Sequence, residues 1–263
     1  MAENALLFEV RDGVARITLN RPDEANPLAV ESAKKLFDYA IEIDQDPSIR
    51  AVILTSTGRF FSAGGDLKFF HDNADRVGHV LKETTSYLHA AQSRFARMAA
   101  PVVVAINGIA AGGGASIAFC GDIVLAAQSA TFTMGYTAAG LSPDGSSSYY
   151  LPRLAGLRRA QELFLTNRRF TADEAAEWGL ITRVVPDDKL MEEADALVAQ
   201  LAKGPTQAFG SVKALLADTF TNTLETQLEM ETRHIAANGA GHDGREGVAA
   251  FVAKRKPDFK GVQ

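Results

Sequence analysis

Short hydrophobic runs rich in β-branched residues recur along the first half of the chain. Residues 51–57 (AVILTST) and 101–110 (PVVVAINGIA) each predict a buried strand, and the run DIVLAAQSATFTM predicts two more short strands. Residues 7–20 predict a hairpin that turns at an Asp-Gly pair. Between these runs, apolar residues at helical spacing predict helices over 27–46 and 77–98. The alternation predicts an α/β fold with crossover connections.

The hydrophobic pattern changes from about residue 158, where helical spacing dominates and few strand signals remain. The stretches LMEEADALVAQLAKG, TQAFGSVKALLADTF and TLETQLEMETRHIAA each predict a helix. We therefore predict a core over residues 1–189 and a helical C-terminal region over residues 190–263, with no low-complexity linker between them.

Composition narrows the class of protein. The chain has 263 residues, of which 46% are hydrophobic and 22% charged, as in ordinary globular domains. Its net charge of -5 argues against a nucleic-acid partner, which would favour an electropositive face. The single cysteine, Cys120, cannot form an intrachain disulfide and is expected to be buried. Because we find no signal peptide and no apolar run of membrane-spanning length, we expect a cytoplasmic location and no membrane contact.

Two glycine-rich loops share a design. FFSAGGDL (60–67) and AAGGGAS (110–116) each follow a buried strand and each open a helix. Glycine permits close backbone approaches, and the N-terminus of a helix presents unpaired N–H groups with a partial positive charge. If both loops point at one spot, their N–H groups would form a pocket for an oxygen anion. Neither loop matches a nucleotide-binding pattern.

The residues in and around these loops resemble a known family. FFSAGGDLKFF and INGIAAGGGASIAFCGDIVLAAQSATF resemble the two characteristic segments of the crotonase superfamily, also called the enoyl-CoA hydratase/isomerase family. The resemblance continues in ITLNRPDEANPL, LTNRRFTADEAAEWGLITRVV and EGVAAFVAKRKPDF, so it covers nearly the whole chain. It implies an α/β, crotonase-like spiral of strand-strand-helix repeats with a helical trimerisation region. It also implies a homotrimer or a hexamer that binds an acyl-CoA thioester.

The resemblance also assigns roles to individual residues. The thioester carbonyl would lie between the backbone N–H groups of Gly65 and Gly113. Phe251 and Lys254 match a C-terminal pair that reaches coenzyme A, often from a neighbouring subunit. The path of coenzyme A would be lined by Arg21, Glu24, Ala25, Ala63, Gly64, Asp66 and Leu67. Coenzyme A would arrive as part of the substrate, with no added cofactor, and the absence of metal-ligand spacing predicts no metal.

The choice of reaction depends on three further positions. Hydratases of the family use two glutamates, and the matching positions here hold Ser116 and Tyr136. Hydration needs one group to activate water and an acid to deliver a proton, so ordinary hydration is not expected. Asp144, in GLSPDGSSSYYLPRLAG, matches the aspartate of double-bond isomerases, which moves a proton between two carbons. Asp144 is therefore the predicted proton shuttle, although Pro-Asp-Gly also suits a surface turn.

Alternatives remain open at this point. His89 matches the water-activating histidine of a 4-chlorobenzoyl-CoA dehalogenase, so a dehalogenase or thioester hydrolase using Asp144 and His89 is a second hypothesis. A lone histidine on a helix also suits a packed or hydrogen-bonded role. Tyr136 would contact the acyl group or pack beside it. A CoA-binding or RNA-binding relative with little catalysis is a third hypothesis. The acidic net charge argues against the RNA-binding form of it. The serines at 146–148 lack a G-x-S-x-G pattern and are expected to cap the next helix.

Overall fold

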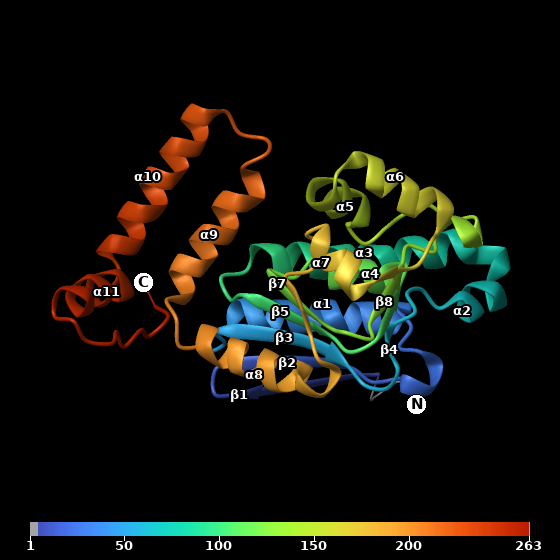
Figure 1. Ribbon diagram of the computed structural model, residues 1–263, viewed down its shortest axis with the longest axis horizontal. Coiled ribbons are helices and arrows are strands. Elements are labelled where there is room, and N and C mark those ends of the chain that lie inside the picture. Colours follow the sequence, from blue (N-terminus) through green and yellow to red (C-terminus); the bar gives the residue numbers. More distant parts are fainter. Residues whose placement is uncertain (1–4, 263) are drawn as a thin grey trace.

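The computed structural model describes residues 5–262 and contains two sheets, surrounding helices and a projecting helical tail (Figure 1). In the larger sheet the strand order is β1-β2-β3-β5-β7-β10, and in the smaller it is β4-β6-β8-β9. The larger sheet comprises β1 (Leu6–Arg11), β2 (Val14–Leu19), β3 (Ala51–Ser56), β5 (Val102–Ile106), β7 (Ile123–Ala127) and β10 (Arg183–Val185). The smaller comprises β4 (Phe60–Ser62), β6 (Ile109–Ala111), β8 (Thr131–Thr133) and β9 (Phe170–Thr171). Only the β1–β2 and β8–β9 pairs are antiparallel.

Helices cover the larger sheet and explain its hydrophobic runs. The strands β3 and β5 are buried almost throughout, as expected for parallel strands covered on both faces. The helix α8 (Leu190–Leu201) packs against β3, β5 and β7, while α1 (Val30–Gln45) and α3 (Val77–Arg97) pack against each other (Figure 1). The first helix of the predicted C-terminal region, α8, thus lies on the core, and the projecting tail begins after it.

The chain repeats one pattern three times. The pairs β3–β4, β5–β6 and β7–β8 each give one strand to the larger sheet and one to the smaller, and helices follow. Besides α3, these helices are α2 (Leu67–Asp72), α4 (Gly113–Ala118), α5 (Ser147–Ala155), α6 (Leu157–Thr166) and α7 (Ala172–Glu177). Single turns of 3-10 helix lie at Pro22–Glu24, Ala74–Arg76, Thr137–Ala139 and Asp187–Lys189. The predicted spiral of strand-strand-helix repeats is confirmed. Because β4 and β6 pair in parallel, the two glycine loops leave the smaller sheet at the same edge.

Two short strands were not expected in the region predicted to be mainly helical. The strand β9 pairs with β8, and β10 extends the larger sheet beside β7. Both are too short for an alternating pattern to register in the sequence, and their extended conformation depends on the strand they pair with.

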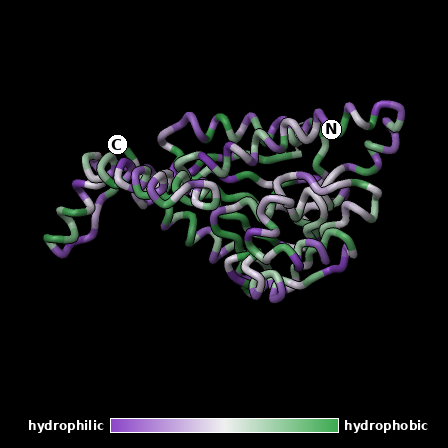
Figure 2. Tube along the Cα trace, turned by 90° about the horizontal axis from the view of Figure 1, so that it is seen from above, coloured by the Kyte–Doolittle hydropathy of each residue, from purple (hydrophilic) through white to green (hydrophobic). Residues whose placement is uncertain are grey.

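The C-terminal tail consists of α9 (Thr206–Asp218), α10 (Leu224–Ala240) and α11 (His242–Val252), which extend away from the sheets (Figure 1). The helix α10 has no buried residue. Apolar segments nevertheless occur along this tail as well as in the core (Figure 2). Within residues 5–262, no helix combines the length and the apolar character that a membrane crossing requires.

Candidate active site

The two glycine loops contact each other backbone to backbone. A Cβ atom on Gly64 would lie 2.6 Å from the carbonyl oxygen of Ala111 and 2.9 Å from the backbone nitrogen of Gly113. Gly64 also has a positive φ of 88°, which side-chain residues rarely adopt. The loop is held in place because Leu28 donates its N–H to the carbonyl of Gly64 at 2.7 Å. Only glycine at residue 64 allows the two loops to approach this closely.

Two glycines whose N–H groups are free of acceptors within the described residues line the same cavity. Gly113 is the first residue of α4, where the helix supplies no acceptor for its N–H group. Among residues 5–262, neither the N–H of Gly65 nor that of Gly113 has a hydrogen-bond acceptor. Both glycines line one cavity of about 350 Å³. A carbonyl oxygen between these two donors would receive two hydrogen bonds and be stabilised as it gains negative charge.

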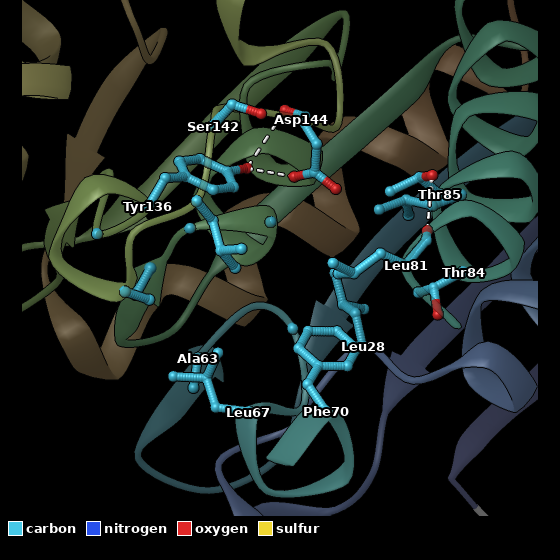
Figure 3. Close-up of a pocket in the computed structure, with 18 residues that line it drawn as sticks. Leu28, Ala63, Leu67, Phe70, Leu81, Thr84, Thr85, Tyr136, Ser142 and Asp144 are labelled. Carbon is cyan, nitrogen blue, oxygen red and sulfur yellow. Dashed lines mark hydrogen bonds between the residues drawn. The ribbon is translucent and has the colours of Figure 1, made fainter. Parts of the chain in front are cut away.

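The wall of this cavity is largely apolar, and it continues into a second, charged cavity. Tyr136 and Asp144 lie on one side of it and the side chains of Leu28, Leu67 and Phe70 on another (Figure 3). The second cavity, of about 620 Å³, shares Ala63, Gly65 and Leu67 with the first. Its remaining lining includes the charged residues Arg21, Glu24, Asp66, Lys68 and Asp72. The cleft therefore has an inner apolar part and an outer charged part, joined at the Gly65 loop.

Ser116 and Tyr136, which occupy the two positions where hydratases have glutamates, are connected to Asp144 by a chain of hydrogen bonds. The hydroxyl of Tyr136 lies 2.6 Å from Oδ1 of Asp144 and 2.6 Å from Oγ of Ser116. Burial, then the negative charge of Asp144 and the hydrogen bond to it, raises the pKa of the Tyr136 hydroxyl well above its ordinary range. Tyr136 therefore stays protonated and donates to Asp144. The second carboxylate oxygen of Asp144 points away from Tyr136 into the cavity (Figure 3).

The loop that carries Asp144 has an unusual backbone. Gly145 has φ 58° and Ser146 has φ 67°, so two consecutive residues are left-handed. A Cβ atom on Gly145 would lie 2.9 Å from Cβ of Ser116, so only a small residue at 116 and glycine at 145 allow this packing. The prediction that the serines cap the next helix is wrong, because Ser146 at the N-cap position makes no side-chain capping bond. Its left-handed backbone instead lets its hydroxyl donate to the carbonyl of Gly145, and Ser147 donates to the carbonyl of Asp144 at 2.7 Å.

The other predicted residues take different places. His89 is exposed on α3 and does not line the apolar cavity; its Nε2 atom accepts a hydrogen bond from the N–H of Gly145 at 3.0 Å. Ala25 accepts the N–H of Ala63 at 2.9 Å, and Asp66 caps α2 by accepting the N–H of Phe69 at 2.9 Å.

The predicted C-terminal pair lies elsewhere. Phe251 and Lys254 are exposed at the end of α11, at the opposite side of the molecule from α2 (Figure 1). Within one chain this pair therefore stands apart from the cleft.

One wall of the cavity was missed by the sequence analysis. Leu81, Thr84, Thr85 and Leu88 of α3 line it, at helical spacing. The same spacing is typical of a helix face that packs on a core, so the pattern alone does not reveal a binding wall. The loop residues Leu141 and Ser142, which precede Asp144, complete this side of the cavity.

Comparison with known proteins decides the family. The family model for enoyl-CoA hydratase/isomerase matches residues 9–262. The chain belongs to the enoyl-CoA hydratase/isomerase family. It is 40% identical to a 1,2-epoxyphenylacetyl-CoA isomerase of Escherichia coli K12, over 97% of this chain and 98% of that one. It is 34% identical to the 4-chlorobenzoyl coenzyme A dehalogenase-2 of an Arthrobacter species, over 96% and 92%. The crystal structure of an enoyl-CoA hydratase from Polaromonas sp. JS666 matches with a TM-score of 0.92 at 32% identity, over 97% and 99%.

Membership of the enoyl-CoA hydratase/isomerase family makes this protein an enzyme that acts on coenzyme A thioesters. The relatives reported above are named for three different reactions, so membership does not select one of them. The selection depends on the groups that face the acyl part of the cleft.

Proposed function

We propose that this protein is a double-bond isomerase of acyl-CoA thioesters in which Asp144 carries the proton. The observation that supports this most is that Asp144 is the one carboxylate lining the inner cavity within residues 5–262. One oxygen of Asp144 is held by Tyr136 at 2.6 Å, and the other faces the cavity. An isomerase needs one group that removes a proton and returns it, whereas the glutamates of hydration are replaced by Ser116 and Tyr136.

The proposed reaction uses only groups of this chain. The thioester oxygen accepts hydrogen bonds from the N–H groups of Gly65 and Gly113. The free oxygen of Asp144 removes a proton from one carbon of the enoyl chain, and the electrons move through the double bond to the thioester oxygen to give a dienolate. Asp144, now protonated, exchanges its carboxyl hydrogen with solvent in part of the turnovers and delivers a proton two carbons away, and the double bond forms at its new place. No atoms are gained or lost, so the reaction requires no added cofactor.

We propose a ring-containing acyl group as the substrate class. The inner cavity, of about 350 Å³, is lined mainly by leucine, phenylalanine and small residues, and its size suits a compact apolar group. We refer to it as the acyl cavity. The 40% identical relative is named for a phenylacetyl-derived thioester, which fits such a cavity. The outer cavity, with Arg21 and Lys68, would take the pantetheine and nucleotide parts of coenzyme A.

A dehalogenase or thioester hydrolase is the second candidate. The 34% identity to a dehalogenase favours it, because Asp144 could also act as a nucleophile. Such a reaction would use His89 to activate water. In this structure Nε2 of His89 is engaged by Gly145, and the ring does not line the acyl cavity. The intact set of donors and carboxylate around the cavity also argues against the third hypothesis, a relative with little catalysis.

We further propose that the chain assembles into a homotrimer or a hexamer through the tail. The tail exposes large apolar side chains that one chain does not cover, namely Val212, Leu216, Phe220, Leu224, Leu228, Ile235, Val248, Phe251 and Val252. Contiguous exposed apolar surface on a globular protein marks an interaction site. Assembly would also bring Phe251 and Lys254 of one chain to the coenzyme A of another.

Hydrogen exchange with solvent tests the proposed reaction. Purified protein is incubated in D₂O with 2-enoyl-, 3-enoyl- and aryl-CoA thioesters, and mass spectrometry follows deuterium uptake at the α and γ carbons. We expect uptake by the wild type and a loss of roughly 10²–10⁴-fold in Asp144→Asn. Asp38→Asn is the matched control, because Asp38 is exposed on α1, pairs with Lys34 and does not line the cavity. Equal uptake by Asp144→Asn and wild type would contradict the proposal, as would no uptake with any thioester that binds.

A further inference from the structure

The backbone of Gly145, the residue that follows Asp144, is held by α3 through both its N–H and its carbonyl group. The N–H of Gly145 donates to Nε2 of His89 at 3.0 Å, and its carbonyl accepts Nε2 of Gln92 at 2.8 Å. His89 and Gln92 are three residues apart, so they lie on the same face of the helix. Gln92 is buried, with 4% of its surface exposed, which fixes it as an anchor. We refer to His89, Gln92 and the backbone N–H and carbonyl of Gly145 as the Gly145 clamp.

The backbone of this loop needs outside contacts to keep its shape. Gly145 and Ser146 both have positive φ, at 58° and 67°. The left-handed region is unfavourable for a residue with a side chain, such as Ser146, and an unfavourable backbone persists only where its surroundings over-determine it. The Gly145 clamp supplies such contacts immediately beside Asp144. A shift of the Gly145 backbone would move the Asp144 carboxylate relative to the Gly65 and Gly113 donors.

The hydrogen bond also defines the state of the His89 ring. A ring nitrogen that accepts an N–H hydrogen bond carries no proton, so the proton of neutral His89 is on Nδ1. The lone pair of Nε2 is therefore engaged by Gly145 and is not free to take a proton from water. The ring lines a separate cavity of about 260 Å³, together with Ser93, Tyr149 and Tyr150, and not the acyl cavity.

We propose that His89 and Gln92 are positioning residues, which hold the Asp144 carboxylate over the acyl cavity through the Gly145 backbone, and that His89 acts as a hydrogen-bond acceptor and not as a base. This inference rests on the proposed role of Asp144. Tyr136 holds the same residue from its side chain, at Oδ1, while the clamp holds it from the backbone. The carboxylate is thus fixed from two directions and keeps one oxygen for the substrate.

Two substitutions at His89 separate an acceptor from a base. Glutamine at this position can accept the Gly145 N–H through its amide oxygen, but it cannot take up a proton at neutral pH, and alanine can do neither. With the thioester identified by deuterium exchange, His89→Ala should lower kcat roughly 10- to 100-fold with KM within about threefold. His89→Gln should restore kcat to within about threefold of the wild type. His79→Ala is the matched control, because His79 is exposed on the same helix, where its ring lies 3.8 Å from the carboxylate of Glu83, and it does not contact Gly145 in the described part of the chain.

A second measurement, made without substrate, tests the clamp directly. Amide hydrogen exchange of Gly145, followed by NMR, should be slow in the wild type and in His89→Gln and faster in His89→Ala. A His89→Gln variant that is as inactive as His89→Ala would overturn the acceptor role, and so would unchanged Gly145 exchange and unchanged kcat in His89→Ala. Faster Gly145 exchange in His89→Ala, together with a wild type that exchanges deuterium into no thioester, would support the clamp and overturn the isomerase proposal. The two proposals can therefore fail separately.

Discussion

The acyl cavity and the C-terminal tail differ in how far a single chain provides their contacts. The side chains of Tyr136 and Asp144 at the cavity find partners within the chain, whereas large apolar side chains of the tail stay exposed. Around the cavity, the Tyr136 hydroxyl is hydrogen-bonded to both Asp144 and Ser116, and the N–H of Gly145 donates to His89. On the tail, α10 has no buried residue, and Ile235 leaves 74% of its surface exposed. The reaction groups are thus arranged within one chain, whereas the apolar surface of the tail has no cover within residues 5–262.

The tail is nevertheless anchored to the core through a buried lysine of α9. Lys213 of α9 is almost fully buried and pairs with Asp122 at 2.7 Å. It also donates to the carbonyls of Phe95 and Ala100 at 2.8 and 3.1 Å. A buried charge that is paired and hydrogen-bonded fixes the orientation of the helix that carries it. Moving the helix would separate the pair and leave a buried charge uncompensated. The exposed apolar tail is therefore a fixed arm, and assembly would need little rearrangement of it.

The largest expected effect is on the cavity side. Ser116→Glu places a carboxylate at a fully buried position beside Gly145 and Tyr136, close to the charge of Asp144. We expect turnover to fall more than about 100-fold without any gain of hydration, because the new side chain displaces the Asp144 loop. Turnover, hydration and oligomer size are measured together. Ser116→Ala, which removes only the hydroxyl, should stay within about tenfold of the wild type. A Ser116→Glu variant that hydrates enoyl-CoA would show that the loop tolerates the glutamate.

A substitution on the tail should have the opposite pattern. Ile235→Glu introduces a charge on α10, at a residue that leaves 74% of its surface exposed in one chain. If the tail forms the interface, the oligomer should dissociate, KM should rise about 10-fold or more, and kcat should change less. Size-exclusion chromatography with light scattering measures assembly. Leu165→Glu, at a residue 73% exposed on α6 of the core, is the matched control. Dissociation by Leu165→Glu alone would place the interface on the core.

A smaller effect is expected at Tyr136. Tyr136→Phe removes the 2.6 Å hydrogen bond to Oδ1 of Asp144 and leaves the ring in place. A hydrogen bond to a charged group contributes about 1.5–3 kcal/mol, so kcat should fall roughly 10- to 100-fold with the oligomer intact. Tyr149→Phe is the control, because Tyr149 lies on α5 outside the acyl cavity. An unchanged kcat in Tyr136→Phe would mean that the backbone contacts of the loop hold Asp144 without it.

The sequence predicted the parts of the fold that depend on local pattern. Continuous β-branched runs such as 51–57 predicted the buried strands, and the glycines of both loops showed that a close approach of the two backbones was possible. The strand β10 was missed, because three residues carry no periodicity of their own. The serine caps were wrong, because the left-handed turn at Ser146 is set by contacts with α3 and not by local propensity.

The site divides in the same way. A family resemblance was enough to propose Asp144, Gly65 and Gly113, since each occupies a recognisable place in a motif. The contacts of His89 and Gln92 with Gly145 join residues more than 50 positions apart, and no local pattern shows them. The cavity wall on α3 was hidden for another reason, because binding faces and core faces share one helical spacing.

The smallest expected effect concerns the far end of the tail and its dependence on pH. Arg255 donates to both carboxylate oxygens of Glu246 at 2.6 and 2.8 Å, and the N–H of Asp258 donates to Oε1 at 2.8 Å. The hydrogen bond to Arg255, followed by that from Asp258, lowers the pKa of Glu246 from its ordinary 4.5 to about 2. Because the pKa is lower in the folded chain, this contact stabilises the fold above about pH 4.5 and is lost as pH falls toward 2.

Glu246→Gln should therefore lower Tm by about 1–3 °C at neutral pH, and the difference from the wild type should shrink between pH 4.5 and 2. Scanning calorimetry across this range measures it. Glu229→Gln on α10 is the control: within residues 5–262 its carboxylate pairs with Arg233 and accepts no backbone N–H, so a smaller change is expected. Glu246 and Arg255 flank Phe251 and Lys254 in the chain. If Tm falls while assembly and KM stay unchanged, the Glu246 contact contributes to folding stability and not to substrate binding at the cleft of a neighbouring chain. A KM that rises together with the loss of the contact would show that it contributes to both.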